Sequence, residues 1–169
     1  MKKIKAALWI LLSMVLITGC AAPKDYFVYT SVDKEWSMQI PKTYEKNMEE
    51  NDETLKIYMK AFKNNKGTVL NIMEMPDEGV KIASEKYIQE ELAAIDDYLH
   101  IERLETINLE KIGKIYGALV EDHATNSYMF LYKWNHSNKL ISVMVYQMRP
   151  FTLEEEAQIK NLISTIKPK

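Results

Sequence analysis

The chain contains a single cysteine, Cys20, and its position limits the chemistry that the thiol can perform. Cys20 follows a segment that begins with Lys2, Lys3 and Lys5 and continues through an uncharged apolar run, residues 6–18. A basic start followed by a short apolar run is typical of an export signal. The run is shorter than the about 20 apolar residues that a membrane-spanning helix needs. We therefore expect that the chain is exported and that Cys20 marks the point of processing.

Residues 17–20, with the sequence Ile-Thr-Gly-Cys, resemble the lipobox of bacterial lipoproteins. That motif consists of an aliphatic residue, a small or hydroxylated residue, glycine or alanine, and cysteine. The resemblance implies that a diacylglyceryl group is attached to the thiol of Cys20 and that a signal peptidase cuts between Gly19 and Cys20. The acylated Cys20 would then bind membrane lipid, because two or more acyl chains anchor a protein stably whereas one chain binds only marginally.

The domain organisation follows from this processing site. We expect a signal peptide in residues 1–19, a lipidated cysteine with a short tether in residues 20–25, and a single domain in residues 26–169. Removal of residues 1–19 removes three lysines and no acid, so 19 basic residues face 24 acidic ones, a net charge of −5. Nucleic-acid-binding proteins carry a basic face, so we expect no nucleic-acid partner. With Cys20 lipidated, the domain has no thiol for a disulfide, a metal site or a nucleophile.

The host determines which membrane receives the anchor. The richness in Lys, Asn, Ile and Glu is compatible with a low-GC Gram-positive host, which would place the domain on the outer face of the cytoplasmic membrane. In a Gram-negative cell, Ala21 after the lipidated cysteine would instead indicate sorting to the outer membrane.

The three histidines, His100, His123 and His136, are not spaced as H-x-H or H-x-x-x-H. His123 follows Glu121 and Asp122, but successive strand residues point to opposite faces. At most Glu121 and His123 then share a face, and two ligands are fewer than the three or four that zinc sites use. We expect an exposed polar strand end here, and no cofactor.

Residues 45–53, EKNMEENDE, form an acidic cluster. Its carboxylates are weak candidates for a divalent cation: Glu49, Glu50, Asp52 and Glu53. The calcium-loop pattern of alternating aspartates, a glycine and a terminal glutamate is absent. We therefore expect a solvated loop, with weak attraction of divalent cations as an open alternative.

No motif of a known catalytic site occurs in the chain. There is no G-x-S-x-G nucleophile elbow, no P-loop and no G-x-G-x-x-G, and five glycines leave little room for phosphate-binding loops. A pair of carboxylates for glycoside chemistry has no local signature and stays open. The sequence favours a protein that is not an enzyme.

The apolar patterns predict four strands, a helix, four more strands and a second helix. The predicted strands are residues 26–31, 36–40, 55–62, 68–73, 103–109, 114–122, 127–134 and 140–148. Residues 55–62 and 68–73 form a hairpin around the turn signal Asn-Asn-Lys-Gly. The first helix follows Ser84 and carries one apolar stripe of Ile88, Leu92, Ile95 and Leu99. The second spans Thr152–Ile166 and opens with a capping box, Thr152 and Glu155.

Aromatic residues are concentrated on one predicted strand, where Tyr128, Phe130, Tyr132 and Trp134 alternate and so share a face. Such a set is found both at binding surfaces and in cores under a helix, and we expect a core. The opposite face would pack under the second helix or reach solvent; it carries Met129, Leu131 and Lys133.

Three pieces of the chain resemble the PsbP-like superfamily, which includes the photosystem II extrinsic protein and the bacterial DcrB-like lipoproteins. They are Trp36-Ser37-Met38-Gln39-Ile40-Pro41, preceded by Tyr29-Thr30-Ser31, then Gly117-Ala118, and the helix Thr152–Ile166. The resemblance covers residues 26–167. It implies an α+β fold in which an antiparallel sheet meander is covered by two helices, an α-β-α sandwich. It implies no particular activity, because fold does not determine function.

Three functions remain for comparison with the structure. The first is a membrane-anchored cell-envelope lipoprotein whose domain is a non-catalytic module for a protein partner. A closed core with an exposed apolar patch would favour it. The alternative is a lipoprotein that binds a small ligand or a divalent cation, which a pocket with converging polar groups would favour. The third is an envelope hydrolase, which a deep cleft with paired carboxylates or a His–Ser contact would favour.

The lipobox resemblance predicts the effect of Cys20→Ser. The variant lacks the sulfur that receives the diacylglyceryl group, so it should take up no lipid label and should not be cut by the lipoprotein peptidase. Metabolic lipid labelling and the size of the membrane-retained protein measure both effects. A variant that is retained in the membrane at the size of the wild type would contradict the prediction.

Overall fold

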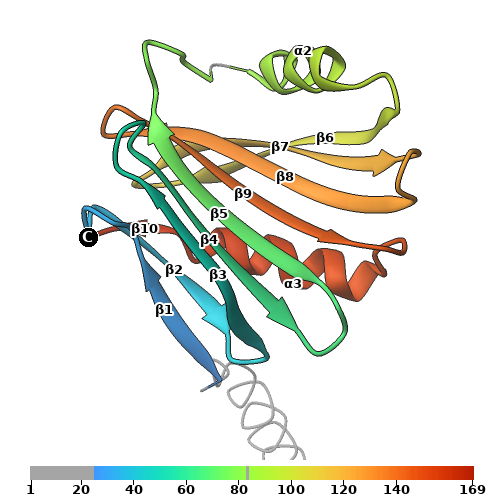
Figure 1. Cartoon of the computed structure of the whole chain (residues 1–169), viewed down its shortest axis with the longest axis horizontal. Coiled ribbons are helices and arrows are strands. Elements are labelled where there is room, and N and C mark those ends of the chain that lie inside the picture. The colour runs from blue at the N-terminus through green and yellow to red at the C-terminus, as the bar shows by residue number, and fades with distance from the viewer. Residues whose placement is uncertain (1–24, 83) are drawn as a thin grey trace, which may run out of the picture.

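The computed structural model describes residues 25–82 and 84–169, so the predicted signal peptide, Gly19 and Cys20 lie outside the described residues. The described residues form ten strands and two helices (Figure 1). The strands are β1 (Tyr26–Thr30), β2 (Trp36–Pro41), β3 (Tyr44–Asp52), β4 (Ile57–Asn64), β5 (Val69–Pro76), β6 (Leu99–Leu109), β7 (Gly113–Asp122), β8 (Ser127–His136), β9 (Lys139–Gln147) and β10 (Lys167–Pro168). The helices are α2 (Glu85–Ile95) and α3 (Leu153–Ser164). Neither helix is long and apolar enough to cross a membrane.

Seven strands form one antiparallel sheet in the order β3-β4-β5-β9-β8-β7-β6. Two meanders, β3–β5 and β6–β9, are joined where β5 pairs with β9. The predicted α+β class, with antiparallel strands and two helices, is therefore confirmed. The predicted hairpin around residues 64–67 is also confirmed, since β4 and β5 pair there in antiparallel register.

The first hairpin does not join the large sheet. Strands β1 and β2 form a separate three-stranded sheet with β10, a short strand after α3 that the sequence did not predict. Strand β2 is buried on both faces at Trp36, Ser37, Met38 and Ile40. Trp36, Met38 and Ile40 share one face, which packs against the large sheet, and Ser37 on the opposite face is also buried.

The prediction of a solvated loop at residues 45–53 was wrong, because most of this segment belongs to the edge strand β3. Only Tyr44 and Met48 of β3 are partly buried, and the remaining residues are exposed. The backbone pairs with β4 through a bulge between Lys46 and Met48. Charged residues and a bulge are typical of an edge strand, where they prevent pairing with another chain. The charged residues that suggested a solvated loop therefore protect the edge of the large sheet from pairing with another chain.

The predicted stripe on the first helix is wrong beyond its second turn. Ile88 and Leu92 are buried in the core, whereas Ile95 is 65% exposed and Leu99 already belongs to β6. The helix ends because Asp96 is extended, with φ −160° and ψ 135°, and its carboxylate accepts the amide of Tyr98 at 3.0 Å. The spacing of apolar residues therefore continued beyond the residue at which the helix ends.

The two helices lie on opposite faces of the large sheet (Figure 1). The α3 face packs against α3 and the small sheet, with Trp36 and Trp134 in edge-to-face contact at 5.4 Å. The α2 face packs against α2 through Ile88 and Leu92. Both faces are apolar where they are covered, so the sheet supplies two cores.

The aromatic prediction is confirmed for three of its four members. Phe130, Tyr132 and Trp134 are fully buried on the α3 face, whereas Tyr128 at the strand end is half-buried and donates to Glu121 at 2.7 Å. The opposite face of β8 was expected under the second helix or in solvent. It instead packs toward α2, the first helix along the chain.

The predicted capping box of α3 is present. The Thr152 hydroxyl accepts the amide of Glu155 at 3.3 Å, and the Glu155 carboxylate accepts the amide of Thr152 at 3.0 Å. Arg149 donates to the same carboxylate and, as the largest cause, lowers the pKa of Glu155 to about 2. The start of α3 is therefore fixed by a residue in the preceding turn as well as by the box.

Gly117 lies directly opposite Tyr132 in the pairing of β7 with β8, and the ring occupies the space of a side chain. A Cβ on Gly117 would lie 2.5 Å from Cδ1 of Tyr132. Tyr132 cannot move easily because it is fully buried, stacks on Phe130 and donates to Glu105. We expect Gly117→Ala to lower the free energy of unfolding by about 1–3 kcal/mol, measured by urea denaturation. The double variant with Tyr132→Leu should lose less than the sum of the single losses, and strict additivity would refute the steric cause.

Candidate functional site

The four cation candidates of the sequence lie on and just after β3 and do not converge. Glu49 and Glu50 are adjacent in the strand and point to opposite faces. The Asp52 carboxylate accepts the amides of Thr54 and Leu55 at 2.9 Å and 3.0 Å, and Glu53 lies in the same turn. Within residues 25–82 and 84–169, no three His, Cys, Asp or Glu side chains are close enough to hold a metal ion.

Glu49 is paired with lysines instead. Lys46 and Lys60 both form ion pairs with its carboxylate, the second at 2.9 Å. The hydrogen bond from Lys46 is the largest cause that lowers the pKa of Glu49, followed by that from Lys60. A carboxylate with two ammonium partners is poorly suited to attract a cation.

The fold brings together two histidines that the sequence separates. The rings of His100 on β6 and His123 after β7 lie 5.9 Å apart. His123 approaches Glu121 at 3.9 Å, as expected for two residues on one face, and Glu121 accepts the Tyr128 hydroxyl. All these groups are at the exposed end of the sheet, and they do not enclose a ligand.

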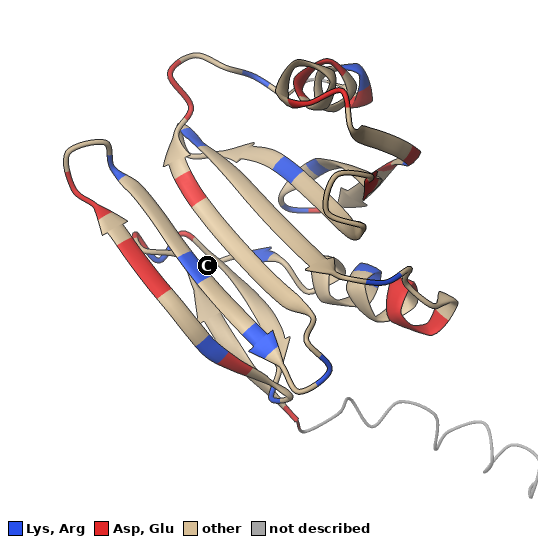
Figure 2. Cartoon of the chain, turned by 45° about the vertical axis from the view of Figure 1, so that its right-hand side comes forward, with Lys and Arg blue, Asp and Glu red and all other residues tan. Residues whose placement is uncertain are grey.

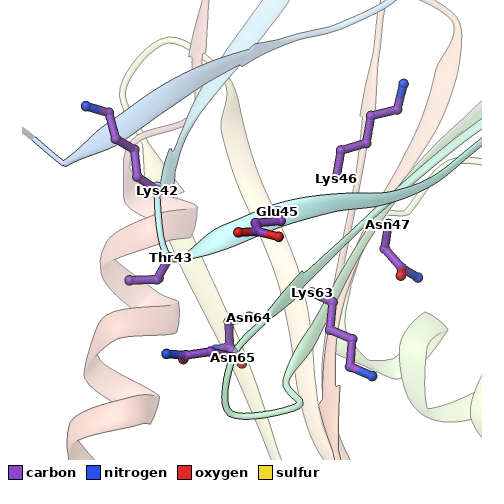
Figure 3. Close-up of a pocket in the computed structure, with 8 residues that line it drawn as sticks. All are labelled: Lys42, Thr43, Glu45, Lys46, Asn47, Lys63, Asn64 and Asn65. Carbon is purple, nitrogen blue, oxygen red and sulfur yellow. The ribbon is translucent and has the colours of Figure 1, made fainter.

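Two depressions mark the surface of the β3–β4 region. The larger, about 400 Å³, is lined by charged and amide side chains, among them Lys42, Lys46 and Lys63. These three side chains point away from one another rather than toward a common centre (Figure 3). The smaller, about 130 Å³, lies between Tyr29, Tyr58 and Lys60. Neither depression is lined by a histidine or a serine.

Glu74 lies fully buried near the smaller depression. Its carboxylate accepts the Tyr29 hydroxyl at 2.8 Å and lies 3.5 Å from the ammonium of Lys139. Burial, and then the charge of Glu74, raises the pKa of Tyr29. These two contacts of Glu74 tie β1 and β9 to β5, so we assign Glu74 a structural role.

Methionine is concentrated on the α2 face of the large sheet. Six of the ten methionines of the chain lie there. The registers of five strands place them on one common face. They are Met48, Met59, Met73, Met75, Met129 and Met144, named here the methionine face. All six are partly buried and partly exposed. Met59 and Met73 lie directly opposite each other on β4 and β5.

The methionine face is only partly covered by the described residues. Helix α2 lies over β6 and β7, and no described helix lies on that side over β3, β4 or β5 (Figures 1 and 2). Met75, Met129 and Met144 border the core under α2, whereas Met59 and Met73 belong to neither core cluster. Thioether side chains are flexible and adapt to different partners, so such a face suits binding of an apolar surface.

Two polar features accompany these methionines. Asn71, between Met73 and Val69 along β5, buries its Oδ1 without a hydrogen-bond partner. Lys133 on β8 forms an ion pair with Glu91 of α2, at the border of the covered part. Buried acceptors are normally paired, and within residues 25–82 and 84–169 the Asn71 oxygen has no donor.

The methionines of this face lie in predicted strands, but the alternation of side chains within each strand did not show that they share one face. Met73 and Met75 are separated by one residue, and Met59, Met129 and Met144 occupy predicted strands. Their common side depends on the β5–β9 and β8–β9 registers, which join segments far apart in sequence. The alternation of side chains within one strand does not show on which side of the sheet the residues of another strand lie.

Solved structures of other proteins resemble the fold. No protein-family model and no curated sequence matches the chain. The cyanobacterial PsbP (CyanoP) of Synechocystis aligns with a TM-score of 0.57 and 9% identity, over 89% of this chain and 98% of that one. The Ran-binding protein Mog1p of Saccharomyces cerevisiae aligns with a TM-score of 0.54 and 8% identity, over 85% and 95%. The likeness supports a PsbP-like fold, as the resemblance of residues 26–167 implied.

The ion pair between Lys133 and Glu91 predicts how α2 is held beside the methionine face. The Lys133 side chain is 9% exposed, so Glu91→Ala leaves a buried ammonium without its partner. We expect a loss of about 2–4 kcal/mol in the free energy of unfolding, measured by chemical denaturation. The double variant Glu91→Ala with Lys133→Met should be more stable than Glu91→Ala alone. An equally unstable double variant would show that α2 is held by other contacts.

Proposed function

We propose that the protein is a lipid-anchored accessory lipoprotein of the bacterial cell envelope whose domain binds a protein partner through the methionine face. The partner presents apolar side chains to Met59 and Met73. The domain itself performs no catalysis. Acylated Cys20 holds it to the membrane.

The observation that carries the proposal is the half-exposed methionine face beside two closed cores. Met59 and Met73 are opposite neighbours with no described helix above them. An apolar patch on a folded domain marks an interaction site more often than a scattered exposed residue does.

The similar structures support a binding role in a limited way. Mog1p is named for binding Ran, so a domain of this fold serves protein recognition there. At 8% identity the structural similarity to Mog1p supports a shared fold, but it does not identify a partner for this chain.

The alternative functions meet their criteria less well. A small-ligand site would show polar groups that converge, and the lysines of the larger depression diverge. A hydrolase would show a deep cleft with paired carboxylates or a His–Ser contact. The smaller depression holds Glu49 and Glu50, but these neighbours in β3 point to opposite faces.

The location of the protein follows from the anchor. In a Gram-positive host the domain lies on the outer face of the cytoplasmic membrane, and in a Gram-negative host Ala21 directs it to the outer membrane. The basis is the lipobox sequence of residues 17–20 together with the basic and apolar segment before it.

Site-specific photo-crosslinking in intact cells tests the binding face. A photoreactive amino acid is placed at Met59, at Met73, or at Gln89, an exposed position of α2. We expect one and the same protein to be crosslinked from positions 59 and 73 and not from position 89, because only the first two lie on the methionine face. Mass spectrometry of the adducts identifies it.

A charge variant gives the matched control. Met73→Glu should abolish the crosslink from position 59, whereas Leu55→Glu, in the exposed turn before β4, should leave it unchanged. Thermal unfolding of both variants confirms that they remain folded. A crosslink that survives Met73→Glu, or one that reaches only a second copy of this chain, would overturn the proposal.

A further inference from the structure

Strand β1 forms one border of the small sheet, and its side away from β2 is named here the free side (Figure 1). We propose that β1 binds an extended, uncharged segment of a partner protein as a further strand of the small sheet. One aliphatic side chain of that segment enters the smaller depression, beside Tyr29. This binding site goes beyond the methionine face, which lies on the other side of the large sheet.

Alternate residues of β1 direct their backbone polar groups to the free side. The carbonyl of Asp25 accepts the amide of Lys42 at 2.8 Å, and the amide of Ser31 donates to the carbonyl of β2 at 3.0 Å. The odd-numbered residues therefore pair with β2, because the N–H and C=O of one strand residue point to the same neighbour. Within residues 25–82 and 84–169, β1 pairs with no other strand. Three residues thus present an N–H and a C=O to the free side: Tyr26, Val28 and Thr30.

The borders of the large sheet are blocked, whereas β1 is not. Strand β3 is charged and has a bulge between Lys46 and Met48. Strand β6 is also charged and has a bulge between Ile101 and Arg103. Strand β1, with the sequence Tyr-Phe-Val-Tyr-Thr, has no charge, no proline and no shift of register, and Val28 at its centre is 53% exposed. An edge strand of this kind is a template for a further strand.

The edge of the large sheet lies beneath the free side of β1. The rings of Phe27 on β1 and Phe62 on β4 are 5.5 Å apart, so β1 lies over β4. On the other side of β1, Trp36 of β2 contacts Trp134 of β8. Strand β3 follows β4 at the border of the large sheet, so it lies beyond β1 by about 4.8 Å, one strand spacing. A second folded copy paired through β1 would bring its own β3 against this one, whereas a single extended segment fits above β3.

The smaller depression provides a place for one side chain of the segment. It has a volume of about 130 Å³ and lies between Tyr29, Val32 and side chains of β3 and β4. The ammonium of Lys60 lies over the ring of Tyr29, and that of Lys139 lies over a second tyrosine of the depression, each at 5.8 Å. Both ammonium groups are also paired with carboxylates. Aromatic walls and paired charges suit an uncharged side chain, and the volume is below the about 300 Å³ of a small-molecule pocket.

Glu74 limits the length of the segment. The next amide on the free side, that of Val32, lies 3.4 Å from the buried carboxylate of Glu74, so the open stretch ends at Thr30. A segment of about five residues spans this stretch. In such an arrangement the main-chain hydrogen bonds supply affinity, and the pocket for a side chain supplies specificity.

Photo-crosslinking in intact cells identifies the segment. A photoreactive amino acid is placed at Val28, or at Val80 in the exposed loop before α2 as a control. We expect position 28, and not position 80, to be crosslinked to one defined segment of a second protein. Mass spectrometry of the digested adduct locates that segment, which should contain an aliphatic residue and no charge in its central five residues. The segment is then synthesised as a peptide.

Hydrogen exchange of the lipidated protein in detergent micelles, resolved to single amides, tests how the synthetic peptide binds. With the peptide at ten times its Kd, the amides of Val28 and Thr30 should exchange about tenfold more slowly. The amides of Phe27 and Tyr29 should be unchanged, because they already pair with β2. Equal protection of both sets, or protection of neither, would overturn the inference.

Matched variants of Val28 test the backbone contact. Val28→Pro removes an N–H that β2 does not use, and proline is tolerated on an edge strand whose N–H faces solvent. Affinity for the peptide should fall at least about fivefold. Val28→Thr keeps the amide and should bind the peptide as the wild type does. Slow exchange at Phe27 and Tyr29 verifies that β1 still pairs with β2 in both variants.

Four outcomes would overturn the inference: equal peptide affinity in Val28→Pro, no crosslinked segment from position 28, a crosslink only to a second copy, or one only to residues 20–24 of the same chain. The methionine face is tested separately, since Met73→Glu should bind the peptide as the wild type does. Failed crosslinks from positions 59 and 73 would overturn that face and leave the peptide result intact.

Discussion

The pairing of β5 with β9 is the contact on which the rest of the structure depends. It joins the two meanders into one sheet, in a register that runs from Val69 opposite Tyr146 to Pro76 opposite Lys139. Because strand side chains alternate, this register sends Leu70 and Ile72 into the core of the α3 face. It sends Asn71 and Met73 to the other side. A slip of one residue would exchange the two sets, so the core and the methionine face are specified together.

The two faces of the sheet are covered unequally, for a geometric reason. On one side, α3 and the small sheet bury Trp36 against Trp134. On the other side, α2 must cover the same seven strands alone. A helix is about 10 Å wide and neighbouring strands are about 4.8 Å apart, so one helix covers about two strands. The strands farther from α2 carry methionine, which tolerates partial exposure because its thioether is flexible and polarizable.

Local chemistry explains what the sequence predicted. The capping box of Thr152 and Glu155, the turn before β5 and the alternation of Phe130, Tyr132 and Trp134 all depend on near neighbours, and all are present. The resemblance of residues 17–20 to a lipobox is likewise local, and it lies outside the described residues. The errors arose where a local pattern had two interpretations. The charged residues of β3 suit a loop as well as an edge strand, and the spacing from Ile88 to Leu99 continued past a helix end.

The sequence by itself therefore determined the α+β class and most strands, because each needs only contacts within a few residues. The tertiary structure alone decided three features: the separation of β1 and β2 into a second sheet, the meeting of His100 with His123, and the common side of the six methionines. These depend on pairings between distant segments. Such pairings are selected by burial of the whole apolar surface, and no local pattern encodes them.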